Sequence, residues 1–457
     1  MHRGRLLSNC IHFMLSHNVL LSTNKEATSV IPSNDRLSGF QRGAVLTAAF
    51  LAWMFAGLEI SLFILIHRQM TISILGRAAP EEIITRWFAW LQAAFLFGAA
   101  AGGWLFGSLG DRVGRKKALA LAVLCYSIGA LACYPVTSLP AMLVIRFVAC
   151  MGIGGVWPNA VALVSEALPK MSRPLLAGIL GAAANVGFVL MGVIGYFAAI
   201  TVTEWRWTLL VAALPIIIGI LIWAFVPESR RWIGVRQEGG KPSAPILEVF
   251  RRPLLYRTIL GIGLGAIPVV GTAANANWLT PWSDQATEQQ AQAQGIDKKT
   301  RPDARAKAKT QITRSGGAIF GSLLGGLIAS AIGRRWSYFF ISLTTFALST
   351  YIFTQLDPLH PQFHWFAFAL GFAGVTYFGW LPLFLPELFL TRVRATGAGI
   401  SFNTGRVVAG IVVLSAGFLI DRLGGDYRRV GIWSGLIYVV GMALIWFAPK
   451  TSRQIED

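Results

Sequence analysis

Long apolar blocks separated by short charged segments constrain this chain more than any other feature. Twelve stretches of about 20 or more mostly apolar residues lie between residues 42 and 449. Each can cross a hydrocarbon layer of roughly 30 Å at 1.5 Å per helical residue. Hydrophobic residues fill 54% of the 457 positions and charged residues only 13%, which leaves too little polar surface for a soluble fold. The pattern predicts an all-α membrane protein with twelve transmembrane helices.

The expected spans lie near 42–66, 86–109, 117–135, 140–164, 174–200, 206–226, 256–281, 313–332, 336–355, 362–386, 395–420 and 429–449. The expected domains are a disordered cytoplasmic tail at 1–41, a six-helix bundle at 42–226, a central cytoplasmic loop at 227–255, a second six-helix bundle at 256–449 and a cytoplasmic tail at 450–457. The external loop 282–314 is rich in Gln, Ala and Lys. We expect a solvated loop there, with short helical extensions, a lid or a partner-binding segment as alternatives.

The positive charge indicates orientation rather than a nucleic-acid partner. The chain holds 40 Lys+Arg against 21 Asp+Glu, a net charge of +19. With the N-terminus inside, the inner segments hold 24 basic residues and the outer loops hold 14, half of them in 282–314. Because basic residues favour the cytoplasmic side of a membrane, this distribution predicts that both termini are cytoplasmic.

Several classes of protein are excluded by what the sequence lacks. The four cysteines, Cys10, Cys125, Cys133 and Cys150, have no metal-ligand spacing. Neither a phosphate-binding loop for ATP nor a catalytic triad is visible. We therefore expect no enzyme activity, no metal, no cofactor and no ATP-driven pumping.

An internal repeat indicates two related halves. GSLGDRVGRKK at 107–117 matches GLIASAIGRRW at 326–336, at an offset of 219. SEALPKMSR at 165–173 matches PELFLTRVR at 386–394, at an offset of 221. VPESRR at 226–231 is paralleled by APKTSR at 448–453. Parallel repeats of this kind place the substrate site between the two halves.

These motifs resemble those of the major facilitator superfamily. GSLGDRVGRKK looks like the signature loop of that family between spans 2 and 3. The series Arg146-x5-Gly152-x-Gly154-Gly155, PESRRW at 227–232 and PELFLTRVRATGAG at 386–399 is similar to the sugar-porter, organic-ion and acid-transporter branch. The resemblance, over about 42–453, implies a transporter that works by alternating access as a functional monomer in a plasma membrane, most simply a bacterial inner membrane. Span 5 lacks the GPxxGG pattern of drug antiporters, which favours uptake over efflux.

Charged and glycine residues at the inner helix ends are candidates for a cytoplasmic gate. Opposite charges on adjacent helix ends can pair when the inner side closes and separate when it opens. Orientation signals and solvated surface pairs are the alternative. The candidates are Gly107, Asp111, Arg112, Gly114, Arg115, Glu166, Arg173, Glu228, Glu387 and Arg394.

Three charges lie inside predicted spans, where an ionised group is costly. Glu59 of span 1 and Arg146 of span 4 lie about 10 Å and about 9 Å from the outer ends of their spans, so they share one depth. We expect them to pair, either as a structural pair or as a protonation switch. The family resemblance links such a pair to proton coupling.

Arg406 of span 11 lies about 18 Å from the inner end, near the midplane. The repeat maps Asn185 onto it, and both are expected to face a central cavity. Because Glu59 and Arg146 cancel, Arg406 would leave the site positive, which predicts an organic anion as substrate. An arginine bound to backbone carbonyls is the alternative. Further polar candidates are Gln92, Asn275, Asn277, Trp278, Tyr377, Trp380 and Asn403.

The predicted function is proton-coupled uptake of a small organic anion, such as a sugar acid, a carboxylate or an aromatic acid. A symporter or facilitator of a neutral sugar is the second interpretation. A membrane sensor is the third, and no signalling domain supports it.

Overall fold

The computed structural model describes residues 37–169, 171–237, 246–252, 254–295, 305–389, 393–422 and 426–449. The chain divides into a short unit, Met1–Phe40, and a large unit, Gln41–Asp457. Most of the predicted tail 1–41, all of the tail 450–457 and part of the central loop 227–255 lie outside the described residues. The large unit carries every feature discussed below.

The described residues form helices joined by short connections, without a strand among them. The helices of the first half are α2 (Gly39–Leu75), α3 (Glu81–Val113), α4 (Arg115–Ala132), α5 (Leu139–Ala167), α6 (Arg173–Phe197), α7 (Trp207–Ala213) and α8 (Ile216–Phe225). Those of the second half are α10 (Leu254–Ala274), η3 (Ala276–Trp278), α11 (Leu279–Ala293), α12 (Ala306–Ile332), α13 (Arg334–Gln355), α14 (Phe363–Glu387), α15 (Arg394–Arg422), α16 (Tyr427–Gly435), α17 (Ile437–Leu444) and η6 (Ile445–Phe447). Between the halves lie α9 (Arg230–Gln237) and η2 (Ile246–Phe250).

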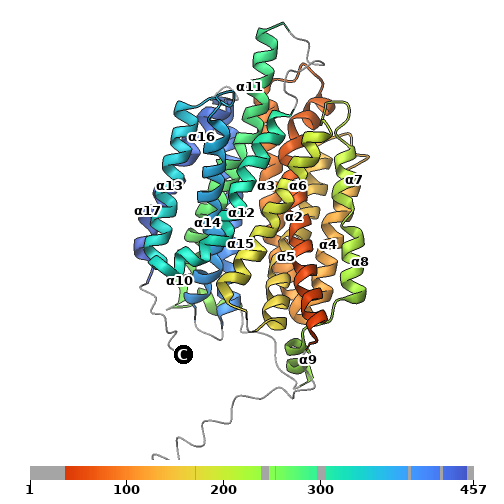
Figure 1. Cartoon of the computed structure of the whole chain (residues 1–457), viewed down its shortest axis with the longest axis vertical. Coiled ribbons are helices and arrows are strands. Elements are labelled where there is room, and N and C mark those ends of the chain that lie inside the picture. The colour runs from red at the N-terminus through yellow and green to blue at the C-terminus, as the bar shows by residue number, and fades with distance from the viewer. Residues whose placement is uncertain are drawn as a thin grey trace, which may run out of the picture. The chain divides into compact units, whose positions relative to one another are not determined.

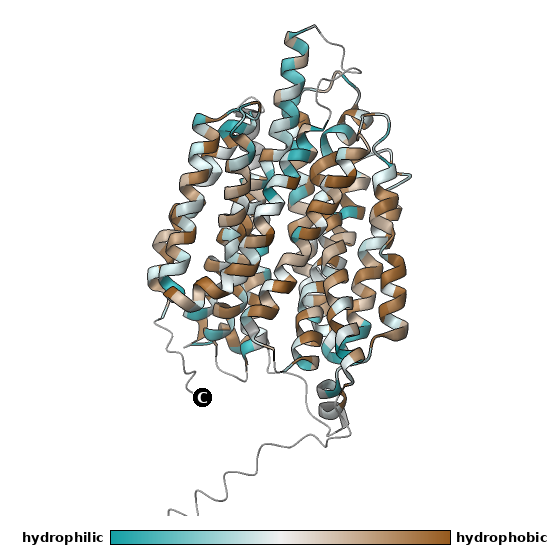
Figure 2. Cartoon of the chain, viewed as in Figure 1, coloured by the Kyte–Doolittle hydropathy of each residue, from teal (hydrophilic) through white to brown (hydrophobic). Residues whose placement is uncertain are grey.

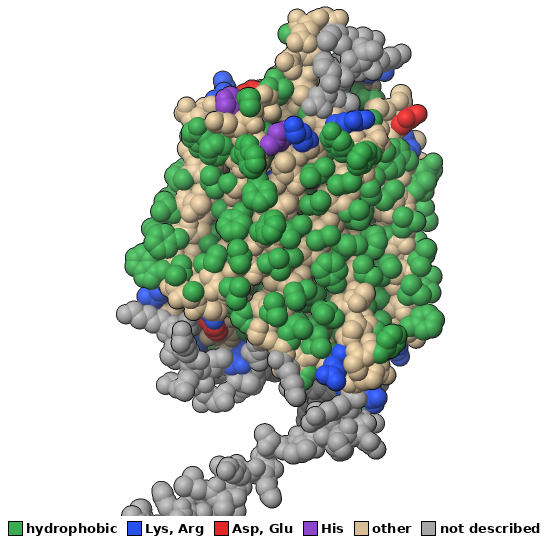
Figure 3. Space-filling view, in the orientation of Figure 1, with side chains coloured by type: hydrophobic (Ala, Val, Ile, Leu, Met, Phe, Trp, Pro, Cys, Tyr) green, Lys and Arg blue, Asp and Glu red, His purple; other side chains and the backbone are tan. Residues whose placement is uncertain are grey.

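The prediction of an all-α membrane protein is confirmed. Eleven segments of the described chain are long and apolar enough to cross a membrane, and α4 occupies the place of the predicted third span. Apolar residues dominate the middle of the helices, and polar residues gather toward their ends (Figure 2). The visible surface accordingly shows a broad belt of apolar side chains with charged side chains above and below it (Figure 3). Such a belt is what a hydrocarbon layer requires.

Local sequence sets several of the helix ends. The Ser138 side chain accepts a hydrogen bond from the amide of Ala141 at 3.3 Å, and a proline follows in the first turn of α5. Asp426 caps α16 through the amide of Arg428 at 2.8 Å. Pro215 separates α7 from α8 within one span, since proline cannot donate the helical hydrogen bond.

The two halves meet along two pairs of helices, which we call the seams. In one seam α12 packs against α6, and in the other α15 packs against α3. Figure 1 shows α13, α14 and α17 of the second half on the left and α4, α7 and α8 of the first half on the right. A residue on a seam therefore touches both halves at once.

The loop 282–314 differs from the expected solvated loop. The helix α11 runs from Leu279 to Ala293, with most residues from 279 to 288 buried, and α12 begins at Ala306. The helices on both sides thus extend into this segment, as the alternative of helical extensions predicts, and its buried residues are polar as well as apolar. The outer part of α11 projects beyond the other helices in Figure 1.

Two glycines confirm the repeat in the backbone. Gly114 joins α3 to α4 with φ 111° and ψ 151°, and Gly333 joins α12 to α13 with φ 85° and ψ 160°. This region of backbone space is essentially restricted to glycine, because a Cβ atom would clash with the neighbouring peptides. The two equivalent connections thus impose the same sharp reversal between antiparallel helices.

Replacing Gly114 with alanine should destabilise the protein by about 1–3 kcal/mol. The strained backbone accounts for this cost, and the added Cβ atom would also lie 2.1 Å from a Glu228 carboxylate oxygen. Thermal unfolding of the purified variant measures the change. Gly107→Ala is the matched control, because a Cβ atom there meets nothing within 4 Å inside a helix. Equal unfolding temperatures for the two variants would contradict the assignment.

Candidate functional site

Glu59 of α2 and Arg146 of α5 form a buried ion pair between two spans. The Arg146 Nη1 atom donates to Glu59 Oε1 at 3.1 Å, and their side chains are 1% and 0% exposed. The Arg146 Nε atom donates to the carbonyl of Leu91 at 3.4 Å, and the guanidinium lies over the Phe63 ring at 3.7 Å. The pairing expected from their shared depth is present.

The pair neutralises two charges that neither helix could bury alone. Removing one partner of a buried pair costs about 3–5 kcal/mol, because the other charge remains without compensation. The second oxygen of Glu59, Oε2, is buried and has no hydrogen-bond partner. That oxygen leaves Glu59 a place to hold a proton without first losing a protein contact.

Arg406 of α15 is a buried guanidinium without a carboxylate partner among the described residues. Its Nη1 atom donates to the carbonyl of Ala99 and to Asn403 Oδ1, each at 3.3 Å. Its charged carbon lies 4.6 Å from the Phe402 ring centroid, and the residue is 7% exposed. Because Ala99 belongs to α3, Arg406 reaches across one seam. The carbonyl and amide dipoles of these partners stabilise its positive charge, and no carboxylate among the described residues neutralises it.

The other polar candidates fall into two groups. Asn275 bonds to Gly431 and Ser434 and accepts from Ser349, so its amide is fully engaged. The hydroxyl of Tyr377 donates to Ser342 at 2.7 Å, and the indole of Trp380 donates to the carbonyl of Arg334 at 2.9 Å. The structure thus places Asn275, Tyr377 and Trp380 in helix packing of the second half.

The second group retains unpaired polar atoms or lies at a seam. Gln92 Nε2, Asn277 Oδ1 and Trp278 Nε1 are buried without a hydrogen-bond partner. Asn185 of α6 donates to Ser322 of α12 at 3.4 Å, across the other seam from Arg406. The repeat therefore places Asn185 and Arg406 on equivalent edges of the two halves.

The charges predicted to face the cytoplasm pair within each half in the same way. Arg115 lies 2.6 Å from Asp111 and 3.9 Å from Glu166, and in the second half Arg334 lies 2.8 Å from Glu387. This duplication follows the sequence repeat, and each pair joins neighbouring helices of one half. Arg112 lies in the last turn of α3, Arg394 begins α15, and the side chain of Arg173 is outside the described residues.

Glu228 adds a further contact at the inner-gate motifs of the first half. Its Oε1 atom accepts from the amides of Lys116 and Ser229, each at 3.0 Å. The hydroxyl of Ser229 donates to Glu166, and the indole of Trp232 donates to the carbonyl of Asp111 at 2.8 Å. These hydrogen bonds therefore hold the segment after α8 against the ends of α3, α4 and α5.

An ion cluster at the opposite end of the helices, which the sequence analysis did not single out, joins the two halves. Arg68 of α2 pairs with Glu288 and Glu81, and its Nε atom lies 3.6 Å from Asp284. Gln69 Nε2 donates to Asp284 at 3.0 Å. Asp284 and Glu288 share one face of α11 at a spacing of four residues. This spacing is the sequence feature from which the cluster could have been predicted.

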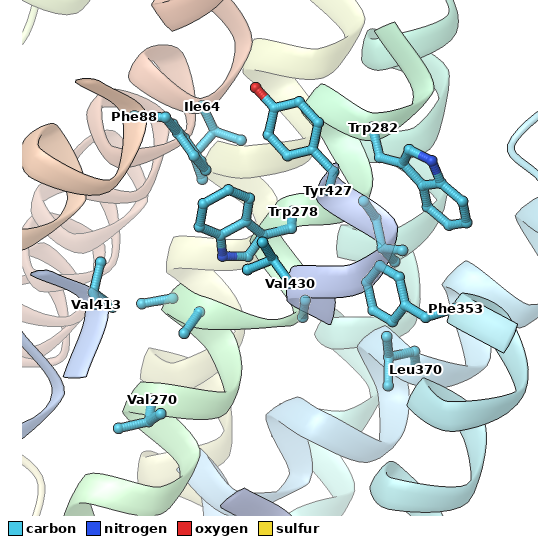
Figure 4. Close-up of a cluster of buried hydrophobic side chains, with 14 of the residues drawn as sticks. Ile64, Phe88, Val270, Trp278, Trp282, Phe353, Leu370, Val413, Tyr427 and Val430 are labelled. Atoms are coloured by element: carbon cyan, nitrogen blue, oxygen red, sulfur yellow. The ribbon is translucent and has the colours of Figure 1, made fainter. Parts of the chain in front are cut away.

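Aromatic side chains close the same outer region. The Phe88 ring of the first half meets Trp278 edge-to-face at a centroid distance of 5.0 Å, and Trp278 meets Tyr427 at 5.4 Å (Figure 4). Trp282 stacks on Phe353 at 5.3 Å. These rings belong to one buried cluster that includes residues of both halves. The outer ends of the halves are thus held together by apolar packing as well as by charge.

Comparison with known proteins finds a matching family, related sequences and a structure with a similar fold. The family model of the Major Facilitator Superfamily matches residues 44–286. The cis,cis-muconate transport protein of Acinetobacter baylyi is 25% identical over 403 residues, 86% of this chain and 90% of that protein. The sialic acid transporter of Escherichia coli is 26% identical over 306 residues, 66% of this chain and 71% of that protein. The crystal structure of a D-xylose-proton symporter superposes with a TM-score of 0.68 at 16% identity, over 91% of this chain and 99% of that one.

Proposed function

The chain belongs to the major facilitator superfamily of transporters, and we propose that it takes up a small organic anion together with a proton. The observation that carries the proposal is the unequal compensation of the buried charges in the spans. Glu59 and Arg146 cancel each other, whereas Arg406 has only neutral partners in the described part of the chain. A carboxylate would supply the missing negative charge, and its two oxygens match the fork of a guanidinium.

The named relatives support a carboxylate. Muconate and sialic acid, which appear in the names of two relatives, are both carboxylic acids. The proposal accordingly takes an organic acid as the substrate class and a neutral sugar as the second candidate. The xylose-symporter likeness concerns the fold and does not favour the sugar.

The ion pair of Glu59 and Arg146 supports coupling to a proton. Protonation of Glu59 would remove the negative charge and leave the Arg146 cation uncompensated in an apolar site. The relative free energies of the conformations would then change with the state of one carboxyl group. The unpartnered Oε2 atom provides the position for that proton.

We further propose that the halves 42–226 and 256–449 move against each other, joined by the segment 227–255. The duplicated pairs Arg115–Glu166 and Arg334–Glu387 support this division, because each stiffens one half internally. A single chain supplies both sides of each seam, which supports a functional monomer. The excess of basic residues in the inner segments supports cytoplasmic termini, and we place the protein in a bacterial plasma membrane.

Replacing Arg406 with glutamine should weaken binding of a transported organic acid by about tenfold or more. A hydrogen bond to a charged group contributes roughly 1.5–3 kcal/mol, which corresponds to this loss. Titration calorimetry of the purified protein against a panel of carboxylates measures it. Arg429→Gln, a change of the same charge at a residue with a 63% exposed side chain, should bind as the wild type does. Unchanged affinity in Arg406→Gln would refute the anion site.

Replacing Glu59 with glutamine should abolish accumulation driven by a pH gradient in proteoliposomes, because the amide cannot exchange a proton. Counterflow exchange of the same substrate should persist, and its persistence shows that the variant is folded. Glu204→Gln changes an exposed carboxylate of an outer connection and should keep both activities. Normal pH-driven accumulation by Glu59→Gln would exclude Glu59 as the coupling residue.

A further inference from the structure

A second buried arginine lies in the second half, in a place that the sequence does not reveal. Arg314 comes eight residues after the first residue of α12, or about 12 Å along the helix. In the sequence it ends a run of basic and polar residues, at the border between the expected loop 282–314 and the expected span 313–332. In the structure it is only 3% exposed.

The guanidinium of Arg314 lacks the partners that other buried arginines have. Its Nε and Nη2 atoms are buried without a hydrogen bond, whereas Arg68 and Arg146 each contact carboxylates. The Phe188 ring of α6 lies 5.7 Å from its charged carbon, and Tyr438 is also close enough to interact with it electrostatically. A buried charge in this condition is strongly unfavourable unless something outside the chain compensates it.

The surrounding turn of α12 is also polar and unsatisfied. Thr310 Oγ1, Gln311 Oε1 and Ser315 Oγ are buried without hydrogen-bond partners. The amide nitrogen of Gln311 donates to the carbonyl of Phe188 at 3.2 Å, and the hydroxyl of Thr313 donates to carbonyls of its own helix. One and a half turns of helix therefore present donors and acceptors that no described residue satisfies, in a segment that is otherwise tightly packed.

This polar turn lies on the seam between α12 and α6. The Gln311 contact to Phe188 crosses from the second half to the first, as does the contact of Ser322 with Asn185. Arg314 lies eight residues outward of Ser322, or about 12 Å along the helix. Arg406 reaches α3 across the other seam, so the two uncompensated cations lie on opposite edges of the second half.

We propose that Arg314 is a second anion-binding residue, which holds a carboxylate of the substrate on the outer part of the α6–α12 seam. The inference rests on the proposed transport of an organic anion and adds a residue and a position to it. The Nε and Nη2 atoms are the two parallel donors along one edge of a guanidinium, and they match the two oxygens of a carboxylate. Gln311 and Ser315 provide additional polar contacts within one turn.

The test is binding of cis,cis-muconate, a dicarboxylate probe, to the purified full-length protein by titration calorimetry. Arg314→Gln should raise the Kd by about tenfold or more, because it removes the positive charge and the two parallel donors of the guanidinium. Arg314→Lys should give an intermediate Kd, since an ammonium keeps the charge without the paired donors. Lys309→Gln makes the same charge change on an exposed position of α12 and should leave the Kd unchanged.

The outcomes separate the two proposals. Wild-type affinity in Arg314→Gln, with loss of affinity in Arg406→Gln, would overturn the role of Arg314 and leave the anion site intact. Failure of the wild type to bind muconate and a wider panel of carboxylates would overturn the proposed function and this inference with it. If Arg314→Gln does not fold, the Kd of Arg314→Lys decides, and a wild-type value would refute the paired-donor contact.

Discussion

The cost of a charge in an apolar interior governs this structure. Glu59 and Arg146 can be buried in neighbouring spans because each compensates the other at 3.1 Å. Among the described residues, Arg406 has a carbonyl and an amide oxygen as hydrogen-bond partners, and the buried Nε and Nη2 atoms of Arg314 have none. Among the buried arginines of the described chain, Arg68 and Arg146 are therefore compensated by carboxylates, whereas Arg314 and Arg406 have no carboxylate partner there.

The ion pairs at the two ends of the helices differ in whether they join the two halves. At the end where α11 lies, Arg68 pairs with Glu288 of the other half, and Phe88 packs against Trp278. At the opposite end of the helices, the ion pairs of Arg115 and Arg334 join helices of the same half. The halves are thus joined at the α11 end by ionic and aromatic contacts, which link the end of α2 to α11.

The sequence predicted the features that follow from periodicity, depth and repetition. The span positions, the meeting of Glu59 with Arg146 and the equivalent pairs of Arg115 and Arg334 are of this kind. Side-chain direction around a helix was not predictable, so Tyr377 and Trp380 could not be separated from residues at the seams. Polar helices were also misjudged, because Arg314 and the start of α11 are buried by neighbours that are distant in the sequence.

The most direct measurement of the central claim is the charge selectivity of uptake by proteoliposomes holding the wild-type protein. A panel of carboxylic acids, their carboxamides and D-xylose would be compared under one inwardly directed proton gradient. The account predicts that an acid accumulates and that its carboxamide and the sugar do not, because only the acid compensates the buried cations. Accumulation of a carboxamide or of xylose, with exclusion of every acid, would contradict it.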